Sequence, residues 1–427
     1  MVDDQVDRDD GIDGLGILPY LGDGLPHRGK VGDDGSAGTY PSIYTGYNLQ
    51  GDKAWIYNGT VVTGVDAAAI PNPNLTWYTA TTKNLGLDFN FWNQKLGGTF
   101  EVFQRNRDGL LATSSVVLPG TVGASMPQEN IESDITFGYE FQLSHRNRVG
   151  EVGYYVTGFM SAAKNRWNYH LDSQAGNSME KWRRDKVSGR NKDIWFSIPE
   201  AGRFTTYEEI QNHPTTGTNY GTGTLPGDYY YEDWNGDGVV DGNDSHPVAT
   251  YNLPVFNYGI TLGADWKGFD LSMNWAGSAG VYSEYGEVFG EVGPFNGGAV
   301  LDMYLDRWHT VNQWDDPWNP HTQWVAGYYP ATSHSFTTGT TGIKDMSYLR
   351  LKSLELGYTL PAKWTRVVNI KSLRVYVSGY NLLTFCKDKY MDPERPGTNG
   401  GAANGNVVLN YNYPVNRTVN VGASLKF

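Results

Sequence analysis

The sequence predicts an all-β protein: an antiparallel, meandering transmembrane β-barrel, here a partial barrel of about ten strands with long extracellular loops. Three observations lead to this prediction. Apolar and polar residues alternate through many short stretches, as side chains do on the two faces of a strand. Short turns join these stretches in pairs, and long links separate the pairs. No stretch approaches the ~18 consecutive apolar residues of a membrane helix, whereas a barrel strand needs an apolar side chain only at every second position.

The N-terminal segment, residues 1–40, is acidic and rich in Gly and Asp, and its apolar residues show no period. We expect loop or disorder there. Its first residues lack the basic and then apolar pattern of a signal peptide. Residues 41–427 are expected to form the barrel part, beginning with one strand after Pro41.

Hairpins follow in order along the chain, each with a two-residue period in both strands and a short turn between them. Their apolar positions are Leu85, Leu87, Phe89 and Phe91 with Leu96, Phe100 and Val102; Phe137, Tyr139, Phe141 and Leu143 with Tyr154, Val156 and Met160; and Tyr258, Ile260, Leu262 and Trp266 with Phe269, Leu271, Met273 and Trp275.

The region 347–427 has the clearest strand pattern. The end of the chain alternates strictly, and residues 373–381 repeat the pattern. In the stretch that starts at Tyr348, Leu349 and Leu351 are out of phase with Leu354 and Leu356. One extra residue near Ser353 would restore a common face, so we predict a β-bulge there. The last strand places these residues on one face: Val419, Val421, Ala423, Leu425 and Phe427.

The links between strands alternate between short and long. Bacterial barrels have short periplasmic turns and long extracellular loops. If Phe427 lies on the periplasmic side, every long link is extracellular and every short turn is periplasmic. The strands expected in this way have about ten to thirteen residues, near the ~9–11 that a tilted strand needs to cross a bilayer. The long links are residues 109–134, 165–254, 281–346 and 384–414.

Residues 348–361 and 373–385, the motif Asp392-Pro-Glu394 and the terminal Phe427 resemble the C-terminal end of SusC-like, TonB-linked outer-membrane transporters. The resemblance extends over roughly residues 32–427. It implies the C-terminal barrel portion of an importer of oligosaccharides or peptides in the bacterial outer membrane, surrounded by outer-membrane lipid. It also implies two protein partners: a SusD-like surface lipoprotein, and the TonB complex, which would act through an N-terminal part of the receptor that this sequence does not resemble.

Two alternatives to the importer stay open. One is a pore-forming or adhesin barrel without active transport, and the other is a soluble, calcium-stabilised β binding module. The net charge of −13 argues against a nucleic-acid partner, because such a partner needs a basic surface. The 8 histidines are scattered and no catalytic constellation is recognisable, so we predict that the chain is not an enzyme.

The segment from Asp233 to Asp244 has the oxygen-donor spacing of a calcium loop, with Gly238 at its sixth position and Asp in place of the usual final Glu. The sequence therefore predicts a structural Ca²⁺ site. The alternative is a turn rich in Asp, Asn and Gly with no metal. The expected ligands are the side chains of Asp233, Asn235, Asp237, Asp241 and Asp244 and the carbonyl of Val239.

Aromatic residues gather in the long link 281–346. Flat aromatic faces stack on the apolar patches of sugar rings, so this cluster is a candidate substrate-binding surface. The alternative is that the rings pack the loop onto its neighbours or onto a partner. The candidate residues are Trp308, Trp314, Trp318 and Trp324.

Overall fold

The computed structural model describes a large part of the chain. The described residues are 18–23, 27–28, 47–67, 70–114, 119, 126–172, 186–192, 194–213, 223–250, 253–285, 301–331, 339–394 and 414–427. The segment 41–46, where the first barrel strand was expected to begin, lies outside them. Among the described residues, no helix is both long enough and apolar enough to cross a membrane.

One antiparallel, 12-stranded sheet dominates the structure, and its successive strands are neighbours, which confirms the predicted meander. No ladder between described residues joins β22 to β1, so the sheet is open and forms part of a barrel. Its strands in spatial order are β1 (Leu18–Asp23), β5 (Thr79–Phe91), β6 (Leu96–Thr113), β7 (Gln128–Val149), β8 (Val152–Tyr169), β13 (Phe256–Trp266), β14 (Phe269–Ala279), β19 (Tyr348–Thr359), β20 (Ser372–Tyr380) and β22 (Thr418–Lys426), with β2 (His27–Arg28) beside β5 and β21 (Thr384–Cys386) beside β19.

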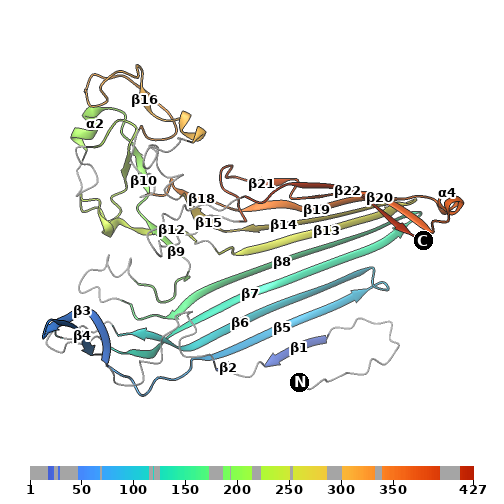
Figure 1. The fold of residues 1–427 in the computed structure, drawn as a ribbon, viewed down its shortest axis with the longest axis horizontal. Helices are drawn as coiled ribbons and strands as arrows, with labels where there is room; N and C mark the ends of the chain where they lie inside the picture. Colours follow the sequence, from blue (N-terminus) through green and yellow to red (C-terminus); the bar gives the residue numbers. More distant parts are fainter. Residues whose placement is uncertain are drawn as a thin grey trace.

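The two ends of the sheet differ (Figure 1). One end, called the turn end, carries the turns 92–95, 150–151 and 267–268 and the C-terminus. The other, called the loop end, carries the links between hairpins. The link between β19 and β20 is the exception to the expected tight turns, because it contains the short helices α4 (Ala362–Thr365) and η7 (Arg366–Val368).

The predicted bulge is confirmed. Asn274 pairs with Ser353 and the next residue, Trp275, pairs with Leu351, so Lys352 is the extra residue in β19. Because one residue is added, Leu349 and Leu351 return to the face that carries Leu354 and Leu356.

Two features of the strands differ from what the sequence predicts. The segment 1–40 was expected to lack structure, but β1 and β2 pair with β5. Backbone groups at the open edge of β5 accept a neighbour with any side-chain pattern, so periodicity does not signal this pairing. The expected length of ten to thirteen residues holds for β5, β13, β14 and β19, but β6 and β8 have 18 residues and β7 has 22. Near the loop end, polar residues occupy both faces of these strands, which hides their extension.

The links at the loop end carry their own small structures. Two-stranded sheets form between β3 (Tyr47–Tyr57) and β4 (Thr60–Ala67), and between β9 (Ile194–Ser197) and β12 (His246–Thr250). Others form between β10 (Glu200–Arg203) and β11 (Tyr229–Tyr231), between β15 (Tyr282–Glu284) and β18 (Ile343–Asp345), and between β16 (His309–Thr310) and β17 (Trp324–Val325). Short helices complete these links: α2 (Tyr207–Asn212), η3 (Gly242–Asp244) and η5 (Asp302–Leu305).

The clusters of buried apolar residues lie in these links and not between two sheets. One cluster joins Val281, Tyr285, Met303, Tyr304, Tyr329, Met346 and Met391. A second joins Leu225, Trp308 and Ala331. In the part of the chain that the structure describes, the large sheet has no second sheet packed on it. The molecule therefore differs from a β-sandwich, whose core fills the space between two sheets.

Candidate functional site

The strand register places the apolar residues of all hairpins on one face of the large sheet, called the apolar face. Directly paired residues of adjacent strands project to the same side. Met160 pairs with Tyr258, Leu262 with Met273, and Leu271 with Leu356. The face continues to the last strand, where Val377 pairs with Val421. Large side chains on this face are strongly exposed: Leu85, Phe100, Met160, Ile260, Phe269, Leu356, Val377, Val421 and Leu425.

The opposite side, called the polar face, carries charged and amide side chains. Near the turn end, Arg374 donates to Asp270 through Nε (3.0 Å) and to Glu355 through a terminal nitrogen (2.6 Å). Arg148 contacts Asp265 at 2.5 Å in the same way. The pair with Glu355 joins the adjacent strands β20 and β19, and the pairs with Asp270 and Asp265 each span one intervening strand. Charge pairs therefore hold the polar face together in addition to the backbone hydrogen bonds.

Aromatic rings on the polar face lie flat over glycines of the next strand. A Cβ added at Gly259 would collide with the ring of Phe159, and one added at Gly263 would collide with Tyr155. Glycine is therefore required at these two positions for the close approach of a ring to the backbone. The rings therefore lie close to the backbone, on a face from which mainly polar side chains project.

A buried ion cluster fixes the link that follows β21 onto the loop end of β19. The guanidinium of Arg350 is only 3% exposed. It donates to Asp392 (2.9 Å) and to Glu394, and its Nε donates to the Thr384 hydroxyl (2.9 Å). Lys352, the bulge residue, also donates to Glu394 (2.6 Å). The cluster explains structurally the Asp392-Pro-Glu394 motif, whose carboxylates satisfy a buried cation.

The pKa values of both carboxyl groups in this link are lowered. Burial acts to raise the pKa of Asp392, but amide hydrogen bonds from Val415 and Glu394 and the charge of Arg350 outweigh it. Burial likewise opposes ionisation of Glu394, and the hydrogen bond from Lys352 together with the charge of Arg350 outweighs it. Both groups are therefore held ionised in the folded chain.

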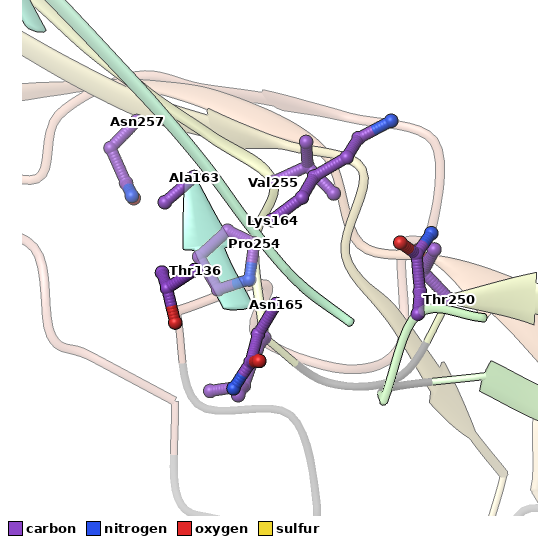
Figure 2. Close-up of a pocket in the computed structure, with 10 residues that line it drawn as sticks. Thr136, Ala163, Lys164, Asn165, Thr250, Pro254, Val255 and Asn257 are labelled. Carbon is purple, nitrogen blue, oxygen red and sulfur yellow. The ribbon is translucent and has the colours of Figure 1, made fainter. Parts of the chain in front are cut away.

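A cavity of about 350 Å³ opens on the polar face at the loop end (Figure 2). Its wall includes Thr136, Asn165 and Asn257 from β7, β8 and β13, together with Pro254 and Val255 from the link before β13. The Oδ1 atom of Asn165 is buried, and it has no hydrogen-bond partner among the described residues. The cavity thus combines apolar walls with polar side chains, among them Thr136 and Asn257, that a hydroxyl or amide group of a ligand could contact.

The structure separates the four candidate tryptophans into two groups. Trp308 is 8% exposed and packs with Leu225 and Ala331, and Trp324 is packed against the same cluster. Both rings therefore stabilise the link, as the packing alternative expects. Trp314 is 83% exposed, and Trp318 is also exposed. A role of these two rings in sugar binding stays a prediction.

The predicted calcium ligands lie on one loop that hydrogen bonds close. Asp233 accepts from the amides of Gly236 (2.7 Å) and Gly238 (2.8 Å). Asp244 is fully buried and accepts from the amides of Asn235 (3.2 Å) and Asp241 (2.7 Å). Asp237 and Val239 lie on the exposed turn between them, where the amide of Val239 donates to Asp237 (2.8 Å).

These hydrogen bonds explain the loop's shape without a cation. Within the described residues, no group of three or more His, Cys, Asp or Glu side chains is arranged to hold a metal ion. An ionised carboxylate has roughly four acceptor positions, however, and the amide bonds above occupy only part of them. Calcium binding by this loop stays a prediction.

Sequence reasoning missed the ion cluster and the cavity. Arg350 and Glu394 are 44 positions apart, and no local pattern indicates that they pair. The cavity depends on how the link before β13 folds over three strands. A usable signal exists only at Arg350 itself, a charge between two leucines of a strand that needs a partner if it is buried.

Comparison with known proteins identifies relatives of this fold. No protein-family model matches the chain. The TonB-dependent receptor P3 of Formosa agariphila is 29% identical over 401 residues, which cover 89% of this chain and 36% of the receptor. The TonB-dependent receptor SusC of Bacteroides thetaiotaomicron is 24% identical over 403 residues, which cover 88% of this chain and 35% of SusC. The chain is thus similar along most of its length to SusC-like TonB-dependent receptors.

Solved structures agree on the fold of this SusC-like chain. The RagAB peptide transporter matches with a TM-score of 0.61 at 21% identity, over 90% of this chain and 38% of that one. A closed state of the RagAB peptide importer matches with a TM-score of 0.59. The resemblance inferred from the C-terminal motifs is thereby confirmed, and the relatives are named as receptors and transporters, as the prediction of no enzyme activity expects.

The SusC-like chain spans about a third of the length of the curated relatives it matches, 36% of one and 35% of another. An open sheet agrees with this fraction, because outer-membrane transporters of this kind close a barrel of roughly 22 strands. The activity, substrates and partners of a complete receptor are therefore proposals for this chain.

Proposed function

We propose that this chain forms the C-terminal part of the barrel wall, with extracellular loops, of an outer-membrane TonB-dependent importer of oligosaccharides or peptides. One observation carries the proposal: a single sheet has a continuous apolar face and a polar face in register, while the buried apolar clusters lie in the links at one end. In water the apolar face would expose a patch far larger than soluble proteins show. In a bilayer it meets hydrocarbon.

The polar face then lines the lumen. Its charges are paired across strands, which suits a water-filled interior or contact with a further part of the receptor. The cavity beside Asn165 opens on this side at the loop end, where an incoming substrate would first meet the wall. Sugar hydroxyls and peptide amides both form hydrogen bonds, so either class suits the polar side chains of Thr136 and Asn257 in the cavity wall.

The loop end is the proposed extracellular side. Its links would contact substrate and a SusD-like surface lipoprotein, and the exposed Trp314 and Trp318 are the aromatic surface available for such contact. Coupling to the TonB complex would act through receptor segments outside this chain. The similarity to SusC and to the RagAB peptide transporter supports this part of the proposal.

A structural Ca²⁺ ion at residues 233–244 is part of the proposal. The loop concentrates carboxylates beside Gly236 and Gly238, both with positive φ, which allow a tight wrap. In an extracellular setting, calcium reaches the millimolar range, at which a weak site fills. Its role would be to hold the long link after β8 in one shape.

Uptake by cells tests the proposal. The gene is deleted from the bacterium that carries it, and the uptake of fluorescent oligosaccharides and of fluorescent peptides is measured separately. We expect uptake of one class to fall and to return on complementation. It should also stop when the proton gradient is dissipated. Uptake that survives this treatment would indicate a passive pore and contradict the importer.

A further inference from the structure

We infer that the link between β19 and β20, residues 361–371, is a second membrane contact that binds the phosphates of phospholipid headgroups at the turn end. The inference rests on the proposed function, because it requires the apolar face of the sheet to lie in a bilayer. It concerns a different element, however, with different chemistry: an exposed apolar pair beside a cluster of cations.

The short helices of this link point two kinds of side chain outward. Trp364 is 59% exposed and Val367 is 83% exposed. Residues three apart are neighbours on a helical surface, so these two side chains form one apolar stripe. Lys363 and Arg366 are also three apart and exposed, and they form a basic stripe beside it. Thr365 is buried and turns the opposite side inward.

Hydrogen bonds hold the link in this position. The amide of Lys371 donates to Lys426 O in β22 (2.8 Å), and the amide of Leu360 donates to Leu373 O in β20 (2.9 Å). Asn369 adopts a left-handed conformation that ends the helical turn. The exposure of Trp364 and Val367 is therefore a fixed feature of the fold, although it leaves two large apolar side chains in water.

An aromatic row on the apolar face leads to this link. Trp266 stacks on Phe269 with ring centroids 6.3 Å apart, and Phe269 lies 4.5 Å from Tyr358. Tyr358 is near the end of β19, just before Pro361. Rows of aromatic residues mark the level of the headgroups in membrane barrels. Figure 1 shows α4 at the turn end, beyond β20.

The charge of the link selects the ligand. Residues 361–371 contain the cations Lys363, Arg366 and Lys371 and no acidic residue, in a chain whose net charge is −13. Cations beside an exposed Trp suit the interface, where the ring lies among headgroups and the cations meet phosphate. The aromatic row of the apolar face ends beside this link, which favours lipid over a protein partner.

Site-directed spin labelling tests the inference on the complete receptor in bilayers of phosphatidylethanolamine and phosphatidylglycerol. The single cysteine is removed by Cys386→Ser, and nitroxides are attached after Val367→Cys, Leu271→Cys or Glu151→Cys. Leu271 reports the apolar face, and Glu151 reports an exposed turn at the same end. We expect collisions of the Val367 label with a water-soluble nickel complex to be several-fold rarer than those of the Glu151 label. Collisions with oxygen should be more frequent at Val367.

The outcomes separate the inference from the proposed function. One outcome overturns the inference alone: the Leu271 label is buried in lipid, but the Val367 label collides with the nickel complex as often as the Glu151 label does. A Leu271 label that is accessible to the nickel complex would contradict the proposed barrel itself. Shielding of Val367 from both oxygen and nickel would indicate a protein contact and also reject the inference. Adding Lys363→Gln and Arg366→Gln should return the Val367 label to water if phosphates hold the link, while Leu271 stays buried.

Discussion

Arg350 shows how a single residue shapes the loop end. Its guanidinium is buried in β19, and both of its carboxylate partners come from the link after β21. A buried ion pair adds little net stability compared with apolar packing, but an unpaired buried charge costs several kcal/mol. The cluster therefore specifies one position for the link, because any other position leaves Arg350, Asp392 and Glu394 without partners.

Replacement of Arg350 tests this role. We expect Arg350→Met to lower the free energy of unfolding of the loop end by ~3–5 kcal/mol, because the buried carboxylate of Asp392 loses its cation and Glu394 keeps only Lys352. Limited proteolysis near residues 387–394 should become faster. Arg148→Met is the matched control, since the pair with Asp265 is exposed on both sides and is worth ~0–1 kcal/mol. Equal effects of the two substitutions would contradict the account.

Acid should release the same link. The pKa values of Asp392 and Glu394 are lowered in the folded chain, so their stabilising contribution is present above the ordinary carboxyl pKa of ~4. It is lost as the pH falls through the lowered values. Protease resistance of the link, measured from pH 7 to pH 3, should decline below about pH 4 in the natural chain. In Arg350→Met the resistance should be low throughout; a steep acid transition in that variant would argue against the cluster.

At the scale of elements, strand β19 shows what a sequence can predict. Its leucines change phase, and one bulge residue restores the common face, as Lys352 does. The alternating strands were predictable for the same reason: every second side chain meets the same medium. By contrast, the pairing of β1 with β5 is a ladder of backbone groups, and the burial of Trp308 depends on residues such as Leu225, far away in sequence. Neither leaves a local pattern.

The bulge gives a prediction that depends on register. Deletion of Lys352 removes the extra residue, yet Leu351 and Leu354 remain on one face because a single residue then separates them. The variant should assemble in the membrane, with a looser link at Glu394. Insertion of one alanine after Leu271 should prevent assembly, since it moves the rest of β14 to the opposite face. Heat-modifiability on gels measures both; assembly of the insertion variant would refute the register.

The loop at residues 233–244 makes a separate prediction. Calorimetry should show Ca²⁺ binding with a dissociation constant of ~10⁻⁴–10⁻³ M, as in other extracellular modules. Asp237→Ala should abolish it. Asp316→Ala is the control, because Asp316 caps another exposed turn, where it accepts from the amide of Trp318. If the natural chain binds no calcium, the calcium prediction is wrong, and the hydrogen bonds of Asp233 and Asp244 alone explain the shape of the loop.

At the scale of the whole molecule, the arrangement is that of a wall with structured links at one end. The large sheet keeps two faces of opposite character and no second layer among the described residues. Within the described ranges, apolar clusters form only where links fold on one another at the loop end. A soluble protein would use its apolar strand faces for a core, so the sheet is built for a medium that is itself apolar.

The assembly of a charged variant tests this central claim most directly. Leu271→Asp places a carboxylate on the apolar face, and Asn274→Asp places one on the polar face of the same strand. A charge facing the bilayer core costs ~2 kcal/mol or more, whereas a charge in the lumen stays in water. With the complete receptor produced in cells, we predict that Leu271→Asp fails to reach the outer membrane as a heat-modifiable barrel and that Asn274→Asp assembles normally. Normal assembly of Leu271→Asp, or failure of Asn274→Asp alone, would contradict the account.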